Sequence, residues 1–222
     1  MRVHTDWLLT PERAAVHLPT ATAVVADLHL GYDLARHRLG DAVPSTGLDD
    51  TTAALSPLLR SRFVRRLLIA GDAVENQSGA ELFALLMKWL ASAGLEWIGL
   101  VPGNHDRSLG DIDSLSCLPD GLTLGSWQIC HGDRRPQGGL QVMGHFHPCL
   151  RLRGRMSAPC YLVGRTRIII PAFSQDAAGV NVLGRAFSRG CRCFAIVQDR
   201  VLDFGNVSRL STRFQKSTRR RV

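Results

Sequence analysis

Residues 66–106 read RLLIAGDAVENQSGAELFALLMKWLASAGLEWIGLVPGNHD, and they contain a strand, a helix and a second strand in succession. The segment 66–70 (RLLIA) is an apolar run typical of a buried strand, and 96–101 (EWIGLV) is similar. Between them, residues 80–92 have helical periodicity and end shortly before Gly94, a residue type favoured just after a helix. This order predicts parallel strands joined by a helical crossover.

The alternation of strands and helices continues on the N-terminal side of this segment and ends on its C-terminal side. Before residue 66 we expect strands at 13–18 and 21–26, followed by helices at 32–39 and 49–60. After Gly121 the chain becomes rich in strands and turns, with the segments WQICHGD, LQVMGHFHP, CYLV, RTRIIIPAF and CFAIVQ. The sequence therefore predicts an α/β fold with two sheets in one domain.

The composition is that of an ordinary globular protein. The chain has 222 residues, of which 45% are hydrophobic and 21% charged, which excludes wholesale disorder. No apolar run approaches the roughly 18–20 residues of a membrane span, so no membrane association is expected. The N-terminal residues lack an uninterrupted apolar core, which argues against a signal peptide and for a cytoplasmic location. The six cysteines contain no C-x-x-C pair and are expected to be unpaired.

The positive charge is concentrated at the C-terminus. The net charge is +8, and residues 209–222 carry six basic side chains and no acidic one, which leaves +2 for residues 1–208. We expect a domain over residues 1–208 and a disordered basic tail over 209–222. An alternative is that the tail is an arm that contacts the phosphates of a polyanion such as DNA.

Potential metal ligands follow five of the expected strands, where each strand ends. Because strand ends converge on one rim of an α/β sheet, we expect these side chains to meet there. Each motif alone has an ordinary explanation as a turn or a cap, but five in this arrangement are not explained by coincidence. The residues are Asp27 and His29 in DLH, Asp72 in GD, Asn104, His105 and Asp106 in GNHD, His131 in HGD, and His145 and His147 in GHFH.

The ordered set DLH, GD, GNHD, HG and GHFH resembles the motifs of the calcineurin-like metallophosphoesterases. The strings DLHLGY, DAVP, LRGRMSAPCYLV and RIIIPAFS are similar to those of the bacterial ligase-associated DNA damage response endonucleases. The resemblance covers nearly the whole chain except the basic tail. It implies a four-layer α/β/β/α sandwich of the metallophosphoesterase type, with a two-metal site on its rim.

The resemblance also implies a role for each motif residue. Asp72 would bridge two divalent ions, His105 would be the catalytic histidine near the leaving group, and Asp106 would orient His105. One departure is Glu75, because relatives often carry histidine or aspartate there; it could orient a ligand or be solvated. The remaining ligands would be Asp27, His29 and His147 for the first ion and Asn104, His131 and His145 for the second.

The chemistry of the ligand set agrees with this assignment. Mixed oxygen and nitrogen ligands without thiolate suit Mn²⁺, Fe or Zn²⁺ better than Mg²⁺ or Ca²⁺, and we expect Mn²⁺. Two such ions can produce hydroxide at neutral pH for attack on phosphorus and can neutralise the phosphoryl oxygens. Arg134 and Arg135 follow His131 and could bind substrate phosphates, although exposed arginines are often only solvated.

The leading hypothesis is a metal-dependent phosphodiesterase, a nuclease acting on DNA or RNA in a DNA-repair context. Its partners would be the nucleic acid and, by resemblance, DNA-repair proteins; the sequence is also compatible with a dimer. A rival with the same chemistry is a hydrolase of nucleotides, cyclic nucleotides or other small phosphate esters. Two rivals of other classes are a catalytically inactive metal-binding scaffold and a nucleic-acid-binding module that depends on the tail.

Overall fold

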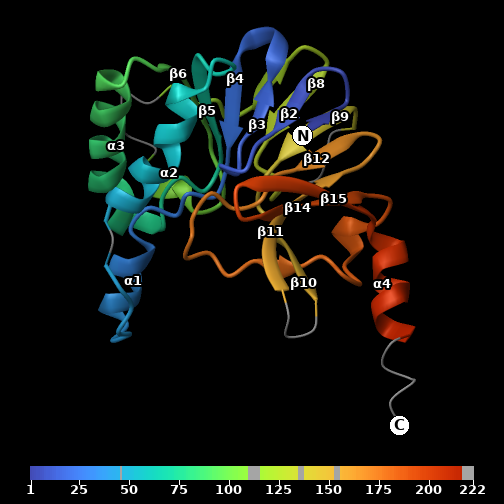
Figure 1. The fold of residues 1–222 in the computed structure, drawn as a ribbon. Helices are drawn as coiled ribbons and strands as arrows, with labels where there is room; N and C mark the ends of the chain where they lie inside the picture. The colour runs from blue at the N-terminus through green and yellow to red at the C-terminus, as the bar shows by residue number, and fades with distance from the viewer. Residues whose placement is uncertain (46, 110–115, 135–137, 153–155, 217–222) are drawn as a thin grey trace.

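The computed structural model describes residues 1–45, 47–109, 116–134, 138–152 and 156–216. Within this part of the chain the expected α/β fold with two sheets is confirmed, and both sheets are mixed. Figure 1 shows the first sheet beside α2 and α3, and the second sheet running down to α4. No helix in the described ranges is long and apolar enough to cross a membrane.

The first sheet has six strands, which lie in chain order from β1 to β6. The first four pair antiparallel, whereas β4, β5 and β6 are parallel to one another. The expected parallel crossover is therefore confirmed, because α3 connects β5 to β6. The strands are β1 (Arg2–Val3), β2 (Trp7–Leu9), β3 (Ala15–His17), β4 (Thr22–Val25), β5 (Arg66–Ala70) and β6 (Glu96–Val101).

The second sheet has nine strands in the described residues and includes all the later ones. Its order is β13-β10-β11-β12-β9-β8-β7, with β14 and then β15 added beside β11. The neighbours β12, β9 and β8 are parallel. The strands are β7 (Leu122–Leu124), β8 (Trp127–Cys130), β9 (Leu140–Met143), β10 (Pro148–Leu152), β11 (Met156–Val163), β12 (Arg167–Ile169), β13 (Val180–Asn181), β14 (Arg192–Val197) and β15 (Arg200–Asn206).

Four α-helices and four short 3₁₀ helices connect or flank the strands of the described chain. The helices expected at 49–60 and 80–92 have those bounds, and the one expected at 32–39 ends one residue earlier. The α-helices are α1 (Tyr32–Arg38), α2 (Asp49–Arg60), α3 (Ala80–Ser92) and α4 (Val207–Lys216). The 3₁₀ helices are η1 (Leu18–Thr20), η2 (Asn76–Gly79), η3 (Asp106–Leu109) and η4 (Ala186–Ser188).

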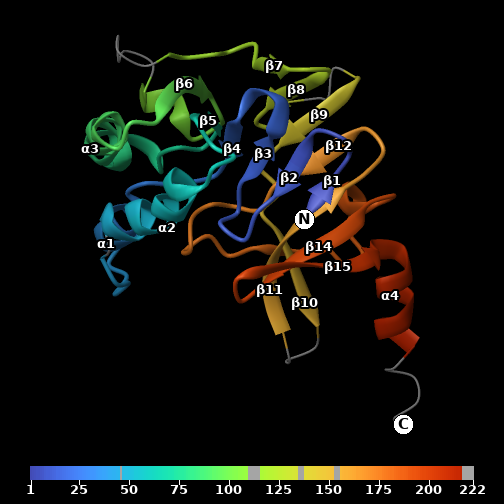
Figure 2. The same ribbon diagram turned by 45° about the horizontal axis from the view of Figure 1, so that its top comes forward.

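The helix α4 crosses residue 208, where the sequence analysis places the boundary between the domain and the basic tail, and residues 209–216 belong to this helix. The reason is hydrophobic: Val207 and Leu210, which lie three residues apart on one face, are buried in the cluster beneath the second sheet. Figure 2 shows α4 alongside β15 and β14. Residues 217–222 lie outside the described ranges.

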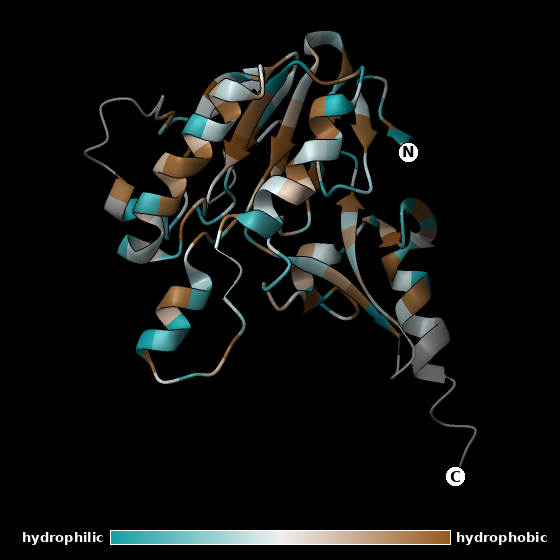
Figure 3. Ribbon diagram, turned by 60° about the vertical axis from the view of Figure 1, so that its left-hand side comes forward, coloured by the Kyte–Doolittle hydropathy of each residue, from teal (hydrophilic) through white to brown (hydrophobic). Residues whose placement is uncertain are grey.

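Apolar side chains form three buried layers. The first lies between the two sheets and includes Trp7 and Leu68 on one side and Val142 and Tyr161 on the other. The second lies between the first sheet and helices α2 and α3, which turn their apolar faces toward it (Figure 3). The third lies between the second sheet and α4. All six cysteines are free, and four of them are buried: Cys149, Cys160, Cys191 and Cys193.

The Tyr161 side chain connects the two sheets through a polar contact inside this core. The side chain is fully buried, and its hydroxyl donates to the carbonyl oxygens of Thr10 and Ala14, at 2.6 and 3.1 Å. Because a buried hydroxyl is costly without a partner, these bonds fix how β11 sits against the chain between β2 and β3. The sheets are thereby held in the relative position that brings their strand ends together.

Candidate metal centre

The predicted ligands meet at the carboxyl ends of strands from both sheets. Asp27 and Asp72 follow the parallel strands β4 and β5, and His131 follows β8 of the other sheet. Backbone hydrogen bonds join these strand ends, because the amide of Asp27 donates to Gly71 at 2.9 Å and that of His29 donates to Asp72 at 3.0 Å. The rim predicted from the sequence therefore exists in the structure.

Three overlapping groups of side chains could hold metal ions in the described chain. They are Asp27–His29–His147, His29–Asp72–His105 and Asp72–His131–His145, and the ligand atoms of each group lie within 4.8 Å of one another. The groups share His29 and Asp72, so they form one continuous centre. Asp72 belongs to two of the groups, which is where a bridging carboxylate would be.

Pairs of imidazole nitrogens face each other at this centre. Nε2 of His29 lies 3.3 Å from Nε2 of His147, and Nδ1 of His145 lies 3.2 Å from Nε2 of His131. The carboxylate of Asp72 lies 3.1 Å from Nε2 of His131. Ring nitrogens that converge in this way are the arrangement that a shared cation stabilises.

The backbone at the centre is held in an unusual conformation. Among the described non-glycine residues nine have positive φ, and five of them are predicted ligands. A left-handed backbone costs a side-chain-bearing residue roughly 1–2 kcal/mol, and such strain is typical of functional sites. The five are Asp27, His29, Asp72, His145 and His147, with φ of 57°, 48°, 49°, 67° and 43°.

Two motif glycines leave room for the carboxylates. A Cβ atom on Gly103 would overlap the carboxylate of Asp72, and one on Gly144 would overlap Ala26 and the carboxylate of Asp27. The glycines of GNHD and GHFH are therefore required by packing against the ligands, independently of any need for positive φ.

Hydrogen bonds to backbone groups orient the candidate ligands. Both carboxylate oxygens of Asp27 accept from the amide of His145, at 3.1 and 2.9 Å. Oδ1 of Asp72 accepts from the amide of His105 at 2.9 Å. Nδ1 of His131 lies 3.1 Å from the carbonyl oxygen of Ala70, and a proton donated there leaves Nε2 free to bind an ion.

The Asn104 side chain provides a test of whether the centre fits a metal ion. Its Oδ1 atom is buried and has no hydrogen-bond partner among the described residues. An unpaired buried carbonyl oxygen costs about 1–3 kcal/mol. A cation would satisfy this oxygen. The donor set therefore fits a bound divalent ion.

The Glu75 side chain is a part of the centre whose role the sequence left open. Its Oε2 lies 2.7 Å from Nδ1 of His29 and 3.4 Å from Nδ1 of His105. The hydrogen bond with His29 is the main cause that lowers the pKa of Glu75. Glu75 thus orients a predicted ligand and the predicted catalytic histidine together. The sequence signal for a role at the centre was the position of Glu75, four residues after Gly71 of the GD motif.

The Asp106 side chain is bound by backbone amides. Its carboxylate accepts from the backbone amides of Gly103, at 2.8 Å, and Val74, at 3.2 Å. Burial raises the pKa of Asp106. The carboxylate that contacts the His105 ring in the described chain is Glu75. Asp106 therefore shapes the GNHD loop, and its expected role in orienting His105 stays a prediction beside the contact of His105 with Glu75.

The charges at the centre are coupled across Asp72 and His131. Burial opposes the charged form of His131, but the hydrogen bond to Asp72 and the charges of Asp27 and Asp72 outweigh it and raise its pKa to about 9. Burial likewise opposes the charge of Asp72, but its contacts with His131 hold the pKa at about 2. In the metal-free protein a proton on His131 thus occupies the place that a cation would take.

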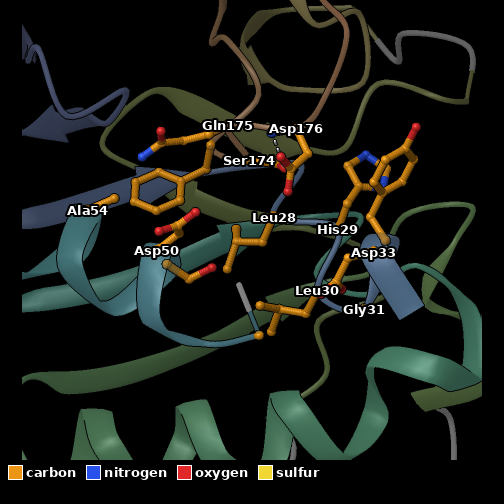
Figure 4. A pocket seen from close by; sticks show the side chains of 14 residues that line it. Leu28, His29, Leu30, Gly31, Asp33, Asp50, Ala54, Ser174, Gln175 and Asp176 are labelled. Atoms are coloured by element: carbon orange, nitrogen blue, oxygen red, sulfur yellow. Dashed lines mark hydrogen bonds between the residues drawn. The ribbon is translucent and has the colours of Figure 1, made fainter. Parts of the chain in front are cut away.

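Three hollows adjoin the centre. One lies beside His29, and Figure 4 shows Asp33, Asp50 and Asp176 around it. A second, of about 240 Å³, contains His147 and Arg13. The third, of about 560 Å³, contains His131 and the predicted substrate-binding Arg134. Arg135 lies outside the described residues.

The Arg13 side chain supports the centre and was not foreseen. Its guanidinium donates to the carbonyl oxygens of Ala172, Phe173 and Ser174, at 3.2, 3.3 and 2.6 Å. The amide of Ser174 in turn donates to the carbonyl oxygen of Asp27 at 3.1 Å. Arg13 therefore holds the segment that fastens Asp27, a relationship across about 160 residues that no local motif reveals.

Comparison with solved structures finds the crystal structure of Pseudomonas putida nuclease MPE. It is similar with a TM-score of 0.72 and 23% sequence identity, over 89% of this chain and 94% of that chain. The two proteins share a fold. No family model matches the chain, and no curated protein matches it.

Proposed function

We propose that this protein is a metal-dependent phosphodiesterase that cleaves a nucleic acid, DNA or RNA. The observation that carries the proposal is the overlap of the three ligand groups at His29 and Asp72, on a strained and buried rim. A binding scaffold has no physical need for a centre in which side chains from both sheets converge at such cost. The name of the structural neighbour, a nuclease, supports a nucleic acid as substrate.

The residues would divide between two divalent ions. Asp27, His29 and His147 would hold the first ion and Asp72 would bridge to the second, whose other ligands would be Asn104, His131 and His145. The mixture of carboxylate, amide and imidazole groups favours Mn²⁺, with Fe or Zn²⁺ as alternatives. When bound, such ions supply a nucleophile at neutral pH and neutralise charge on the phosphoryl oxygens.

The side chain of His105 would supply the remaining requirement, a proton for the departing oxygen. Its side chain is 37% exposed, so a substrate can reach the ring. Its Nδ1 lies 3.4 Å from Glu75, which leaves Nε2 for the substrate. An imidazole held in this way acts as a general acid, and such catalysis contributes typically 10²–10⁴-fold to a rate. In-line attack of water on phosphorus then needs no covalent enzyme intermediate.

The resemblance of the sequence motifs supports further parts of the proposal. They are a DNA-repair context, repair proteins as partners, a cytoplasmic location and the four-layer sandwich of metallophosphoesterases. The two sheets with α2 and α3 on one side and α4 on the other are compatible with that sandwich.

The experiment compares hydrolysis of a diester and a monoester, bis-p-nitrophenyl phosphate and p-nitrophenyl phosphate. Metal-free protein is reconstituted with Mn²⁺ and assayed beside His105→Ala, then with DNA and RNA. Cleavage of the diester that needs Mn²⁺ supports the proposal, together with cleavage of DNA or RNA that falls in the variant, because the alkoxide leaving group of a nucleic acid needs a proton. Activity on the monoester alone overturns it in favour of a phosphatase of small esters, and metal-loaded protein inactive on every substrate favours a scaffold.

A further inference from the structure

The largest of the three hollows has the chemistry of a nucleotide site. Its volume of about 560 Å³ lies within the range of about 300–1,000 Å³ typical of ligand pockets. The imidazole of His131, a predicted ligand, forms part of its wall, so its occupant would touch the metal centre. Four arginines from three separate parts of the chain line it: Arg134, Arg165, Arg167 and Arg189.

The arginines are available to bind an anion. None of the four forms an ion pair within the described residues, whereas Arg36 and Arg192 elsewhere do. The guanidinium of Arg167 donates to the carbonyl oxygen of Arg189 at 2.8 Å, which holds two of the arginine-bearing segments together. Asp120 and Asp133 are the carboxylates in the described lining, so the cationic side chains exceed the anionic ones by two.

The other two hollows are less suited to a nucleic acid chain. The one beside His29 has carboxylates and no lysine or arginine in its described lining. The one beside His147 has two arginines and no carboxylate in its described lining, but it has less than half the volume of the largest hollow, and Arg13 donates to three carbonyl oxygens. An anionic chain leaving the metal centre is therefore attracted toward His131 and repelled on the side of His29.

The cavity also offers apolar surface for a sugar and a base. Val101, Pro102, Met143 and Phe146 line it together with the amide side chains of Gln128 and Gln141. Phe146 is held in place because it stacks on Phe187, with ring centroids 4.9 Å apart. Cationic groups around an aromatic and apolar wall match a nucleotide, which combines a phosphate with a stacking base.

We propose that this cavity binds the nucleotide next to the scissile phosphate, with Arg165 and Arg189 contacting the backbone phosphate that follows. The inference rests on the proposed function, because it places the scissile phosphate at the metal centre. It assigns the cavity to polymer binding and leaves cleavage to the residues of the centre. A small diester, which lacks the neighbouring nucleotide, would not use it.

The test compares two substrates of the Mn²⁺-loaded protein, a short oligothymidylate and bis-p-nitrophenyl phosphate. The variant is Arg165→Ala/Arg189→Ala, and the matched control is Arg60→Ala, an exposed arginine at the end of α2. Loss of two phosphate contacts should raise KM for the oligonucleotide about tenfold or more. Because both arginines contact the same phosphate, the double variant should also lower the slope of log KM against log salt by about 0.7. Hydrolysis of the small diester should stay unchanged in both variants.

The outcomes separate the two proposals. Wild-type protein that cleaves neither substrate overturns the proposed function. Wild-type protein that cleaves both, with the double variant indistinguishable from Arg60→Ala on the oligonucleotide, overturns the cavity assignment alone. A double variant that loses activity equally on both substrates also overturns the cavity assignment, because the arginines would then act on the metal centre itself. Circular dichroism of each variant excludes unfolding as the cause of a loss.

Discussion

The carboxylate of Glu75 lies 2.7 Å from Nδ1 of His29, across 46 positions of the sequence. The same oxygen lies 3.4 Å from Nδ1 of His105. One side chain therefore orients both a predicted metal ligand and the predicted general acid. By accepting a hydrogen bond from Nδ1–H of His29, it leaves Nε2, which faces His147, free for an ion.

Substitution of Glu75 should weaken metal binding. Loss of a group that orients a ligand typically lowers metal affinity about 10–100-fold. We expect a loss in this range for Glu75→Ala and a smaller one for Glu75→Gln, which keeps an acceptor oxygen. Competition between the protein and a fluorescent Mn²⁺ chelator measures the affinity. Unchanged affinity in Glu75→Ala would show that His29 needs no such support.

The side chain of His105 should be needed for chemistry and dispensable for metal binding. In His105→Ala we expect full metal content, with kcat for a diester that has an alkoxide leaving group reduced about 10²–10⁴-fold. The loss should be much smaller for a p-nitrophenolate leaving group, which needs no proton to depart. A parallel loss on both esters would contradict the role of general acid. Loss of metal would instead assign His105 as a ligand, because it lies in the group with His29 and Asp72.

The metal-free protein should lose stability as pH rises through 9. The pKa of His131 is raised to about 9 from its usual 6.5, so the stabilising effect of its proton is complete below 6.5 and disappears above 9. The proton on His131 contributes at most about 3 kcal/mol to the free energy of unfolding. The lowered pKa of Asp72, about 2, places the matching loss on the acid side below pH 3.8.

Urea unfolding in EDTA at pH 6 and pH 9 measures this effect. The control is His131→Gln, in which the titrating group is absent and the difference between the two pH values should shrink. An equal difference in wild type and variant would contradict the coupling of His131 to Asp72.

A methyl group at Gly144 should disturb the centre. In Gly144→Ala the Cβ would overlap Ala26 and the carboxylate of Asp27, and such overpacking costs typically about 1–3 kcal/mol. The matched control is Gly164→Ala, where a Cβ would make ordinary contacts. Thermal unfolding and Mn²⁺ binding should both be impaired in the first variant and little changed in the second. Equal behaviour of the two variants would contradict the packing argument.

The strands and helices that frame the centre could be predicted from the sequence because their signals are local. The apolar run at 66–70 and the periodic segment at 80–92 have strong patterns over one element each. That the candidate ligands would meet could be predicted for the same reason, since each motif follows a strand. Convergence of five strand ends then follows from the geometry of an α/β fold.

The remaining features depend on contacts between distant residues. The helix α4 has mainly polar residues and is held through Val207 and Leu210, so its sequence resembles a solvated tail. The role of Glu75 depends on where η2 places it relative to His29, and that of Arg13 on a segment near residue 173. The cavity arginines Arg165 and Arg189 lie in loops without a motif.

The most direct test of the account is the number of Mn²⁺ ions bound per chain, measured by mass spectrometry of the metal in wild type and in Asp72→Asn. Asp72 joins two ligand groups and accepts from the amide of His105, so loss of its charge should affect both ions together. The account predicts two ions per wild-type chain and loss of both in the variant. A wild-type chain that binds one ion or none, or a variant that keeps two, would contradict it.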